Sequence, residues 1–196
     1  DQLYPSAGDR VSLLRHLFPT AQLELHLAIR SPATFLPALV AEDKSGTVLT
    51  QVQQGDPLAL RWSKTLAQMA EAAPDVPITV WCDEDTPLLW AEILRKVSGH
   101  EEGMVLDGWL AWYWQMVTPQ AHEAMRRWFE RNPAPDDLSR RKTLSVMLSR
   151  MARPEAVESD PLLPGWTEET VEALEAIYEE DLDLIGTLPG VTLLEP

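Results

Sequence analysis

At four points in the sequence, a residue that can cap a helix is followed directly by a proline and then by a helical pattern of apolar residues. A capping serine, threonine or aspartate accepts hydrogen bonds from free amides of the first helical turn, and proline suits that turn because it has a helical φ and no amide hydrogen. The four pairs are Ser31-Pro32, Asp56-Pro57, Thr86-Pro87 and Thr118-Pro119. Because apolar residues follow each pair at helical spacing, the sequence predicts helices that begin at these four points.

Further helical patterns lie in the C-terminal half, and three short runs have the character of strands. One helix is marked by Leu144, Met147, Leu148 and Met151, and a long last helix is opened by Thr167. The strand runs are Leu23 to Ile29, Ile78 to Cys82 and Val191 to Leu194. Strands separated by helical crossovers indicate a parallel sheet. The expected fold class is therefore α/β, a parallel sheet with helices on both faces, and a helix-rich C-terminal half.

The composition is that of one compact domain over residues 1–196, with 45% hydrophobic and 24% charged residues. Cys82 is the only cysteine, so no disulfide forms within the chain, which suits a reducing cytoplasm. No apolar run approaches the roughly 18 residues that a membrane span needs. We therefore expect a cytoplasmic protein with no membrane partner. The chain starts at Asp1 rather than methionine and has few strands for such a sheet, so we expect a piece of something longer.

The acidic residues are concentrated near the C-terminus. The net charge is −15, which argues against nucleic acid and anionic membranes as partners. Twelve Asp or Glu and no Lys, Arg or His lie between Pro154 and Pro196, whereas the segment from Arg126 to Arg153 has an excess of basic residues. Two interpretations are open: the two segments are solvated helix faces that lie against one another, or the basic segment binds an anion.

The first strand ends in an arginine and is followed at once by a helix start. In an open parallel sheet, ligands bind at the carboxyl ends of the strands, where helix N-termini present free amides and a positive dipole end. We therefore expect Arg30 to bind a phosphate, with Ser31 and the amides of Ala33 and Thr34 beside it. The alternative is that Arg30 pairs with the acidic residues 83–85 after the second strand, and that Ser31 only caps its helix.

Three segments together carry a resemblance to a known family. The run Leu25-His26-Leu27-Ala28-Ile29-Arg30-Ser31-Pro32 is followed later by Ile78-Thr79-Val80-Trp81-Cys82-Asp83-Glu84-Asp85-Thr86-Pro87, and then by residues 165–182 with the ending Tyr178-Glu179-Glu180-Asp181-Leu182. These segments resemble the sulfotransferases of the P-loop nucleotide-binding superfamily, of the bacterial type. That family shows a strand ending in Arg-Asn-Pro or Arg-Asp-Pro, a later strand ending in Tyr-Glu-Asp-Leu, and a closing helix with Tyr-x-x-Asp-Leu.

The resemblance implies a donor nucleotide, 3′-phosphoadenosine-5′-phosphosulfate, and transfer of its sulfonate to an unknown acceptor. It also implies that the 3′-phosphate is bound by Arg30 and by a serine eight positions later, where this chain has Ala38. The family's 5′-phosphosulfate loop, Pro-Lys-Ser/Thr-Gly-Thr-Thr, has no counterpart between Asp1 and Leu23. Two functions are therefore open: a sulfotransferase whose first strand and loop are missing from this chain, or a catalytically degenerate relative that acts as a binding or interaction domain.

Two other segments carry letters of phosphate-binding motifs in the wrong setting. Lys44-Ser45-Gly46-Thr47 copies part of the loop, but it follows an expected helix, and the preceding Glu42 and Asp43 repel a phosphate. Arg140-Arg141-Lys142 is similar to a basic motif late in the family fold, but Thr143 stands where the motif has glycine. We expect neither segment to be the main anion site.

The sequence assigns no catalytic residue and no metal site. His26 alternates with apolar neighbours in the first strand, as a packed imidazole does, and His100-Glu101-Glu102 lacks the spacing of a metal motif. Large apolar side chains are clustered at Trp109, Trp112, Tyr113, Trp114 and Met116. We interpret this cluster as core packing, with an acceptor-binding wall or a contact between copies of the chain as alternatives.

Overall fold

The computed structural model describes residues 3–101, 104, 106–157 and 162–196. Contacts divide the chain into two compact units, of which unit 1 comprises residues 1–83 and 160–194, and unit 2 comprises residues 84–159 and 195–196. Each unit has a hydrophobic core of its own. The single domain expected over residues 1–196 stays a prediction. Within the described ranges, no helix is both long enough and apolar enough to cross a membrane.

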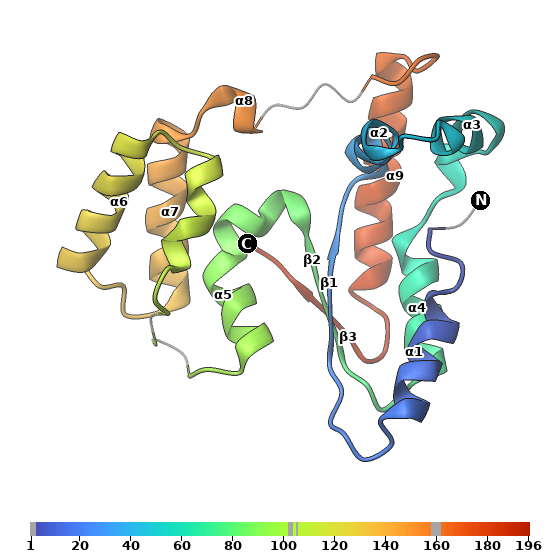
Figure 1. Cartoon of the computed structure of the whole chain (residues 1–196), viewed down its shortest axis with the longest axis horizontal. Helices are drawn as coiled ribbons and strands as arrows, with labels where there is room; N and C mark the ends of the chain where they lie inside the picture. Colours follow the sequence, from blue (N-terminus) through green and yellow to red (C-terminus); the bar gives the residue numbers. More distant parts are fainter. Residues whose placement is uncertain (1–2, 102–103, 105, 158–161) are drawn as a thin grey trace. The chain divides into compact units, whose positions relative to one another are not determined.

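Unit 1 is built on a sheet of three parallel strands (Figure 1). The strands are β1 (Leu25–Ile29), β2 (Ile78–Cys82) and β3 (Val191–Leu194), with β2 in the centre. Ile78 is aligned with Leu25 on one side and with Val191 on the other. Parallel neighbours need a crossover, and the helices between the strands supply it. The strand runs, their parallel direction and the coarse α/β class are therefore confirmed.

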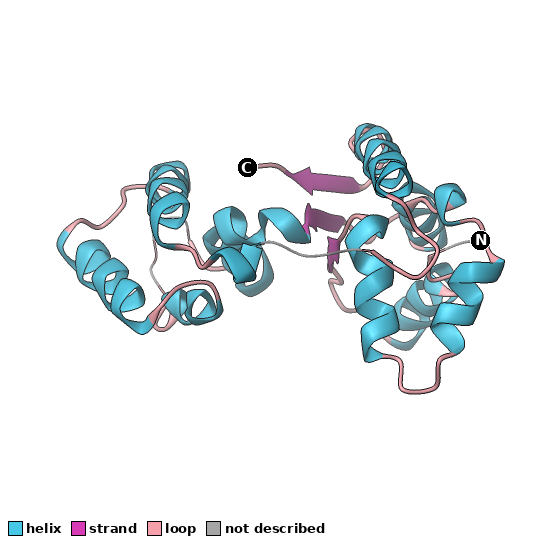
Figure 2. Cartoon of the chain, turned by 90° about the horizontal axis from the view of Figure 1, so that it is seen from above, coloured by secondary structure: helices cyan, strands magenta, loops and turns pink. Residues whose placement is uncertain are grey.

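One face of this sheet is covered by helices of unit 1. The unit contains α1 (Ala7–Leu17), α2 (Pro32–Glu42), α3 (Thr47–Gln54), the 3-10 turn η1 (Pro57–Ala59), α4 (Trp62–Ala72) and α9 (Glu168–Ile185). Side chains alternate along a strand, so Ile78, Val80 and Cys82 share one face, and all three are buried. Residues of α1, α4 and α9 cover them (Figures 1 and 2). The expectation of helices on both faces stays a prediction.

Three helix starts predicted from capping residues are confirmed with their caps, whereas at Thr86-Pro87 the helix begins at Thr86 itself and has no side-chain cap. The Ser31 hydroxyl accepts a hydrogen bond from the Ala33 amide at 3.3 Å, at the start of α2. Thr118 and Thr167 accept equivalent hydrogen bonds at 3.3 Å, at the starts of α6 (Pro119–Arg131) and α9. These caps depend only on residues two or three positions apart, so the local sequence is sufficient to predict them.

The start expected at Asp56-Pro57 was wrong in its extent. Asp56 accepts a hydrogen bond from the Leu58 amide at 3.0 Å, but this cap opens only the 3-10 turn η1. Leu60 and Arg61 then have extended backbone, and the α-helix α4 begins at Trp62. The cap of α4 therefore has to come from elsewhere in the chain.

A buried carboxylate of α9 caps α4. Oδ2 of Asp181 accepts hydrogen bonds from the amides of Trp62 at 2.6 Å and Ser63 at 3.1 Å. The Ser63 hydroxyl donates to Oδ1 of the same carboxylate. Asp181 is only 1% exposed, and these hydrogen bonds, with the positive end of the α4 dipole, offset the cost of burying its charge. This contact fixes α9 against the start of α4.

Replacing Asp181 with alanine leaves two buried amides of α4 without a partner. We expect Asp181→Ala to lower the free energy of unfolding by about 3 kcal/mol or more, as measured by urea denaturation. The matched control is Asp183→Ala, because Asp183 is exposed on the same helix, and its effect should stay below about 0.5 kcal/mol. Equal effects of the two substitutions would contradict the capping role.

Unit 2 is largely helical, as expected for the C-terminal half. Its elements are α5 (Thr86–Ser98), the 3-10 helix η3 (Trp109–Gln115), α6, α7 (Asp137–Met151) and α8 (Pro154–Val157), and the short turn η2 (Asp83–Asp85) precedes α5. The aromatic cluster contributes to the core, since Tyr113 is fully buried and donates to the Pro87 carbonyl at 2.8 Å. Trp114, in contrast, is 51% exposed. A contact between copies of the chain through this cluster stays a prediction.

Candidate functional site

A hollow of about 290 Å³ lies in unit 1, where β1 and β2 end. Its lining comprises Tyr4, Leu27, Ala28, Arg30, Phe35, Ala38, Leu39, Glu42, Trp62 and Asp83, and we call it the Arg30 hollow. Ile29 is aligned with Cys82, so Arg30 and Asp83 leave neighbouring strands at the same edge of the sheet. The carboxyl edge of a parallel sheet is where such folds bind ligands.

Arg30 retains unused hydrogen-bond donors at this hollow. Its Nε donates to Oγ1 of Thr34 at 2.9 Å, and the indole nitrogen of Trp62 donates to its carbonyl at 2.8 Å. Nη1 and Nη2 make no hydrogen bond or ion pair with a residue that the structure describes. The alternative pairing of Arg30 with residues 83–85 is therefore not formed. Thr34 holds the guanidinium, and two outer nitrogens remain for a ligand.

Three aromatic rings form one wall of the Arg30 hollow. Trp62, which is 2% exposed, lies 5.9 Å from Tyr4 in a stacked arrangement and 5.4 Å from Phe35 edge to face, measured between ring centres. Tyr4 is 53% exposed and has a φ of 46°, a left-handed backbone that is costly for a residue other than glycine. Its exposed ring offers a surface for stacking a planar ligand. Sequence reasoning missed these rings, because Trp62 fits an apolar helical stripe and nothing marks Tyr4.

Three smaller or acidic side chains limit what the Arg30 hollow can bind. Ala38 lies eight residues after Arg30, on α2, and its methyl group donates no hydrogen bond. Glu42 and Asp83 are exposed and bring two carboxylates to the same hollow. These two negative charges reduce the attraction of the single guanidinium for a phosphate dianion.

The other three predicted site residues do not line the hollow. Ser31 and Ala33 are buried, and the Ala33 amide already donates to the Ser31 hydroxyl. The Thr34 amide donates to the Ser31 carbonyl at 3.0 Å. The helix start thus satisfies these amides internally, as an N-cap serine does. That Ser31, Ala33 and Thr34 take part in anion binding stays a prediction. It requires the amides of Ala33 and Thr34 to break their hydrogen bonds to Ser31.

Asp43 accepts hydrogen bonds from Ser45, within the Lys44 to Thr47 segment, and from Val48, directly after it. Its carboxylate accepts from the Ser45 amide at 2.8 Å, the Ser45 hydroxyl at 2.6 Å and the Val48 amide at 2.7 Å. Gly46 has a left-handed φ of 72°, which lets the chain turn into α3. A carboxylate of the chain itself therefore accepts these hydrogen bonds, and the expectation that this segment is not the main anion site stays a prediction.

Hydrogen bonds from Ser45 and Val48 hold the pKa of Asp43 below its ordinary value of 3.8. A lowered pKa in the folded state means that the stabilisation by Asp43 is complete above about pH 4 and is lost as the pH falls through the lowered pKa. By NMR, we expect the chemical shift of the Asp43 carboxyl carbon to titrate with a midpoint below pH 3.8. Over the same pH range the Val48 amide should lose protection from hydrogen exchange, because its acceptor becomes protonated. In Asp43→Asn the protection of the Val48 amide from hydrogen exchange should no longer change over this pH range. A midpoint at or above 3.8 would contradict the arrangement.

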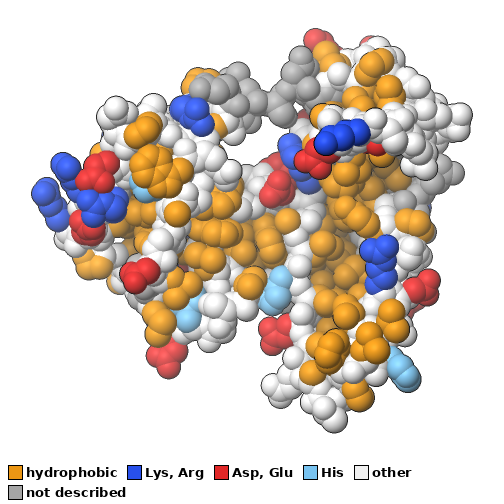
Figure 3. Space-filling model, viewed as in Figure 1, with side chains coloured by type: hydrophobic (Ala, Val, Ile, Leu, Met, Phe, Trp, Pro, Cys, Tyr) orange, Lys and Arg blue, Asp and Glu red, His pale blue; other side chains and the backbone are white. Residues whose placement is uncertain are grey.

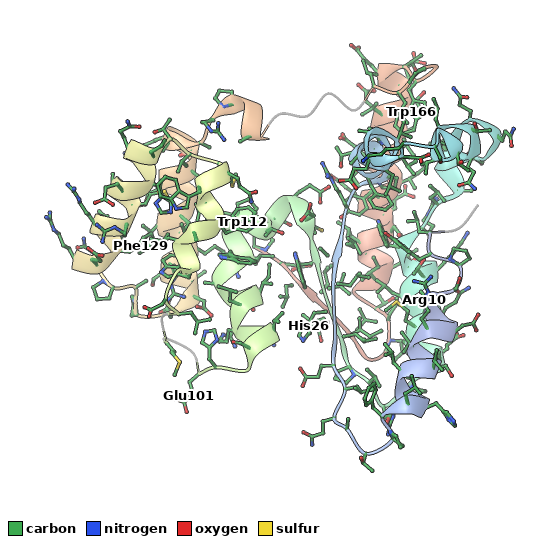
Figure 4. All side chains as sticks on the ribbon, in the orientation of Figure 1. Arg10, His26, Glu101, Trp112, Phe129 and Trp166 are labelled. Atoms are coloured by element: carbon green, nitrogen blue, oxygen red, sulfur yellow. The ribbon has the colours of Figure 1, made fainter. Side chains whose placement is uncertain are left out.

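The other residues singled out in the sequence lie outside the Arg30 hollow. His26 on β1 is half-buried, with Nε2 at 3.7 Å from the Glu24 carboxylate (Figure 4). Cys82 is buried in the core at the end of β2. In the part of the chain that the structure describes, no three His, Cys, Asp or Glu side chains are grouped to hold a metal ion. Glu102 of the His100 segment lies outside the described residues.

The basic segment of α6 and α7 is paired within unit 2. The ion pairs are Arg126–Glu123, Arg126–Glu130, Arg127–Glu123, Arg140–Asp137 and Arg141–Glu92. All these carboxylates precede Pro154. These are ion pairs between described residues only, so both interpretations of the charge pattern stay predictions.

No family model, curated protein or solved structure matches this chain. Function is therefore inferred from the geometry of the Arg30 hollow and from the motifs that surround it.

Proposed function

We propose that this chain is a sulfotransferase-like protein with the fold of the P-loop superfamily, and that its Arg30 hollow binds the 3′-phosphate of 3′-phosphoadenosine-5′-phosphosulfate. The observation that carries the proposal is Arg30, which lines the hollow while its two outer nitrogens have no described partner. A guanidinium binds a phosphate through two parallel charge-assisted hydrogen bonds. A phosphate bound in the hollow would accept the hydrogen bonds that these two nitrogens do not make with the described residues.

Two further features support a nucleotide in preference to a simple anion. The family's second phosphate-binding position falls on Ala38, and Ala38 lines the same hollow as Arg30. The exposed ring of Tyr4, supported from behind by Trp62, gives a flat apolar surface on which an adenine can stack. Phosphate and base would thus be held by side chains from different segments of unit 1.

A second candidate function is a relative that no longer transfers sulfonate and acts as a binding or interaction domain. The observation that favours it is the same Ala38, because its methyl group cannot make the second hydrogen bond to the phosphate. Glu42 and Asp83 add repulsion between the hollow and a dianion. The two candidates differ in whether the native hollow binds the nucleotide.

Titration with adenosine 3′,5′-bisphosphate tests the role of Arg30. We expect the nucleotide to raise the melting temperature, and Arg30→Gln to weaken binding at least about tenfold in calorimetry, because charge-assisted hydrogen bonds are lost. Arg10→Gln is the matched control, since Arg10 is an exposed guanidinium on α1 outside the hollow (Figure 4). It should bind as the native chain does. Equal affinities of Arg30→Gln and the native chain would exclude this site.

Restoring the serine separates the two candidate functions. Ala38→Ser should strengthen nucleotide binding about fivefold, since one neutral hydrogen bond contributes about 1 kcal/mol. Measurable binding by the native chain, strengthened in Ala38→Ser, supports the transferase. Binding that is detectable only in Ala38→Ser supports the degenerate relative. If neither protein binds at about 1 mM nucleotide, the proposed site is wrong.

A further inference from the structure

Unit 2 contains a hollow of about 530 Å³, which we call the Arg140 pocket. Trp109, Trp114 and Phe129 form its aromatic wall, and Arg140 is part of the lining. Phe129 lies on α6 (Figure 4). The face of unit 2 that is seen in Figure 3 exposes hydrophobic side chains with charged side chains beside them. A pocket of this size, mostly apolar with a few polar groups, is typical of sites for small organic molecules.

Arg140 is a buried cation with an unsatisfied donor. It is 5% exposed, its Nη1 donates to Asp137 at 2.6 Å, and its guanidinium carbon lies 5.4 Å from the centre of the Trp109 ring. Its Nη2 is buried and has no hydrogen-bond partner among the described residues. An unpaired N–H inside a protein costs free energy, and the cost is greater for a charged group. Arg140 thus brings to the lining a shielded donor that an anionic ligand can satisfy once a neighbouring side chain moves aside.

The charge of Arg140 is only partly neutralised. Asp137 accepts from Arg140 through one oxygen and from Nε of Arg95 through the other, at 3.0 Å. Arg95 also lies 3.8 Å from Glu92, which pairs with Arg141 at 2.7 Å. This series of contacts therefore joins three guanidinium groups to two carboxylates. Asp85 also interacts electrostatically with Arg141, at the other end of this series, whereas Arg140 has only its share of Asp137.

The lining of the Arg140 pocket also disfavours a ligand with many charges. Glu123 and Glu130 both pair with Arg126, and the hydrogen bonds from Arg126 and Arg127 lower the pKa of Glu123 to about 2. The negative charges of Glu123 and Glu130 are therefore neutralised by guanidinium groups at neutral pH. Asp107, which is exposed, adds a negative charge to the lining. These acidic side chains give a polyanion no additional attraction, whereas a monoanion with an apolar body can pack on the aromatic wall.

We propose that the Arg140 pocket binds a small organic monocarboxylate with an aromatic or similarly flat apolar body. The carboxylate accepts a hydrogen bond from Nη2 of Arg140, and the apolar body packs on Trp109 and Phe129. Because Nη2 is shielded from water, a side chain of the lining has to move for the carboxylate to reach it. This inference uses residues of unit 2 alone and does not depend on nucleotide binding in unit 1.

Phenylacetate is a suitable probe, with phenylacetamide as its neutral counterpart of nearly the same shape. We expect phenylacetate to change tryptophan fluorescence and to bind at least about tenfold more tightly than phenylacetamide in calorimetry, because only the carboxylate pairs with Arg140. Equal affinities would overturn the proposal. The absence of phenylacetate binding at about 10 mM would overturn it as well.

Two variants test the location of the site. Arg140→Met keeps a long side chain without its donors, and should weaken phenylacetate binding at least about tenfold and abolish the preference over phenylacetamide. Ala111→Trp places an indole in the pocket from an exposed residue of its lining, so it should block binding while the protein stays folded. Ala124→Trp is the control, since Ala124 is exposed on α6 outside the lining. Native affinity in Ala111→Trp would overturn the proposal.

The nucleotide and the carboxylate can be tested independently on the same protein. Arg30→Gln should bind phenylacetate as the native chain does, and Ala111→Trp should leave the response to adenosine 3′,5′-bisphosphate unchanged. Loss of phenylacetate binding in Arg30→Gln would place the carboxylate in the Arg30 hollow and overturn the assignment to the Arg140 pocket. A failure of either proposal is therefore recognisable without the other.

Discussion

The buried carboxylate of Asp181 is the contact on which the arrangement of unit 1 depends. It fixes the first turn of α4 by accepting the amides of Trp62 and Ser63. The indole of Trp62 in turn donates to the carbonyl of Arg30 and supports the ring of Tyr4. A charge on the last helix therefore positions an arginine at the end of the first strand, through one tryptophan. The Arg30 hollow results from this connection between distant segments.

The two candidate sites share one electrostatic feature in different surroundings. Arg30 and Arg140 each keep guanidinium nitrogens without a described partner, although the chain as a whole carries a net charge of −15. The Arg30 side chain lines an open hollow that also contains carboxylates, whereas Nη2 of Arg140 is shielded and its guanidinium lies beside the Trp109 ring. The net charge of a chain thus says little about a single site, because pairing and burial set the local balance.

The Arg30 hollow was predictable in part. Parallel strands bind ligands at their carboxyl ends, so the position of Arg30 after β1 was sufficient to single it out. The adjacent amides of Ala33 and Thr34 were expected to be free, but Ser31 accepts both of them through its hydroxyl and its carbonyl. Tyr4 reaches the hollow only because the N-terminal segment folds back to it, which no local pattern reveals, whereas Glu42 lies one helical turn after Ala38 on α2.

The sequence by itself determined the elements whose causes are local. Helices α2, α6 and α9 begin where a hydroxyl and an amide lie within three residues of one another, and the strands follow from short β-rich runs. Only the tertiary structure decided where α4 begins, because its cap, Asp181, is 119 residues away from Trp62. It also decided that Arg30 forms no ion pair with a described residue and that Asp137 is shared by two arginines. The formation of ion pairs depends on distances across the fold, and these cannot be deduced from the spacing of residues along the chain.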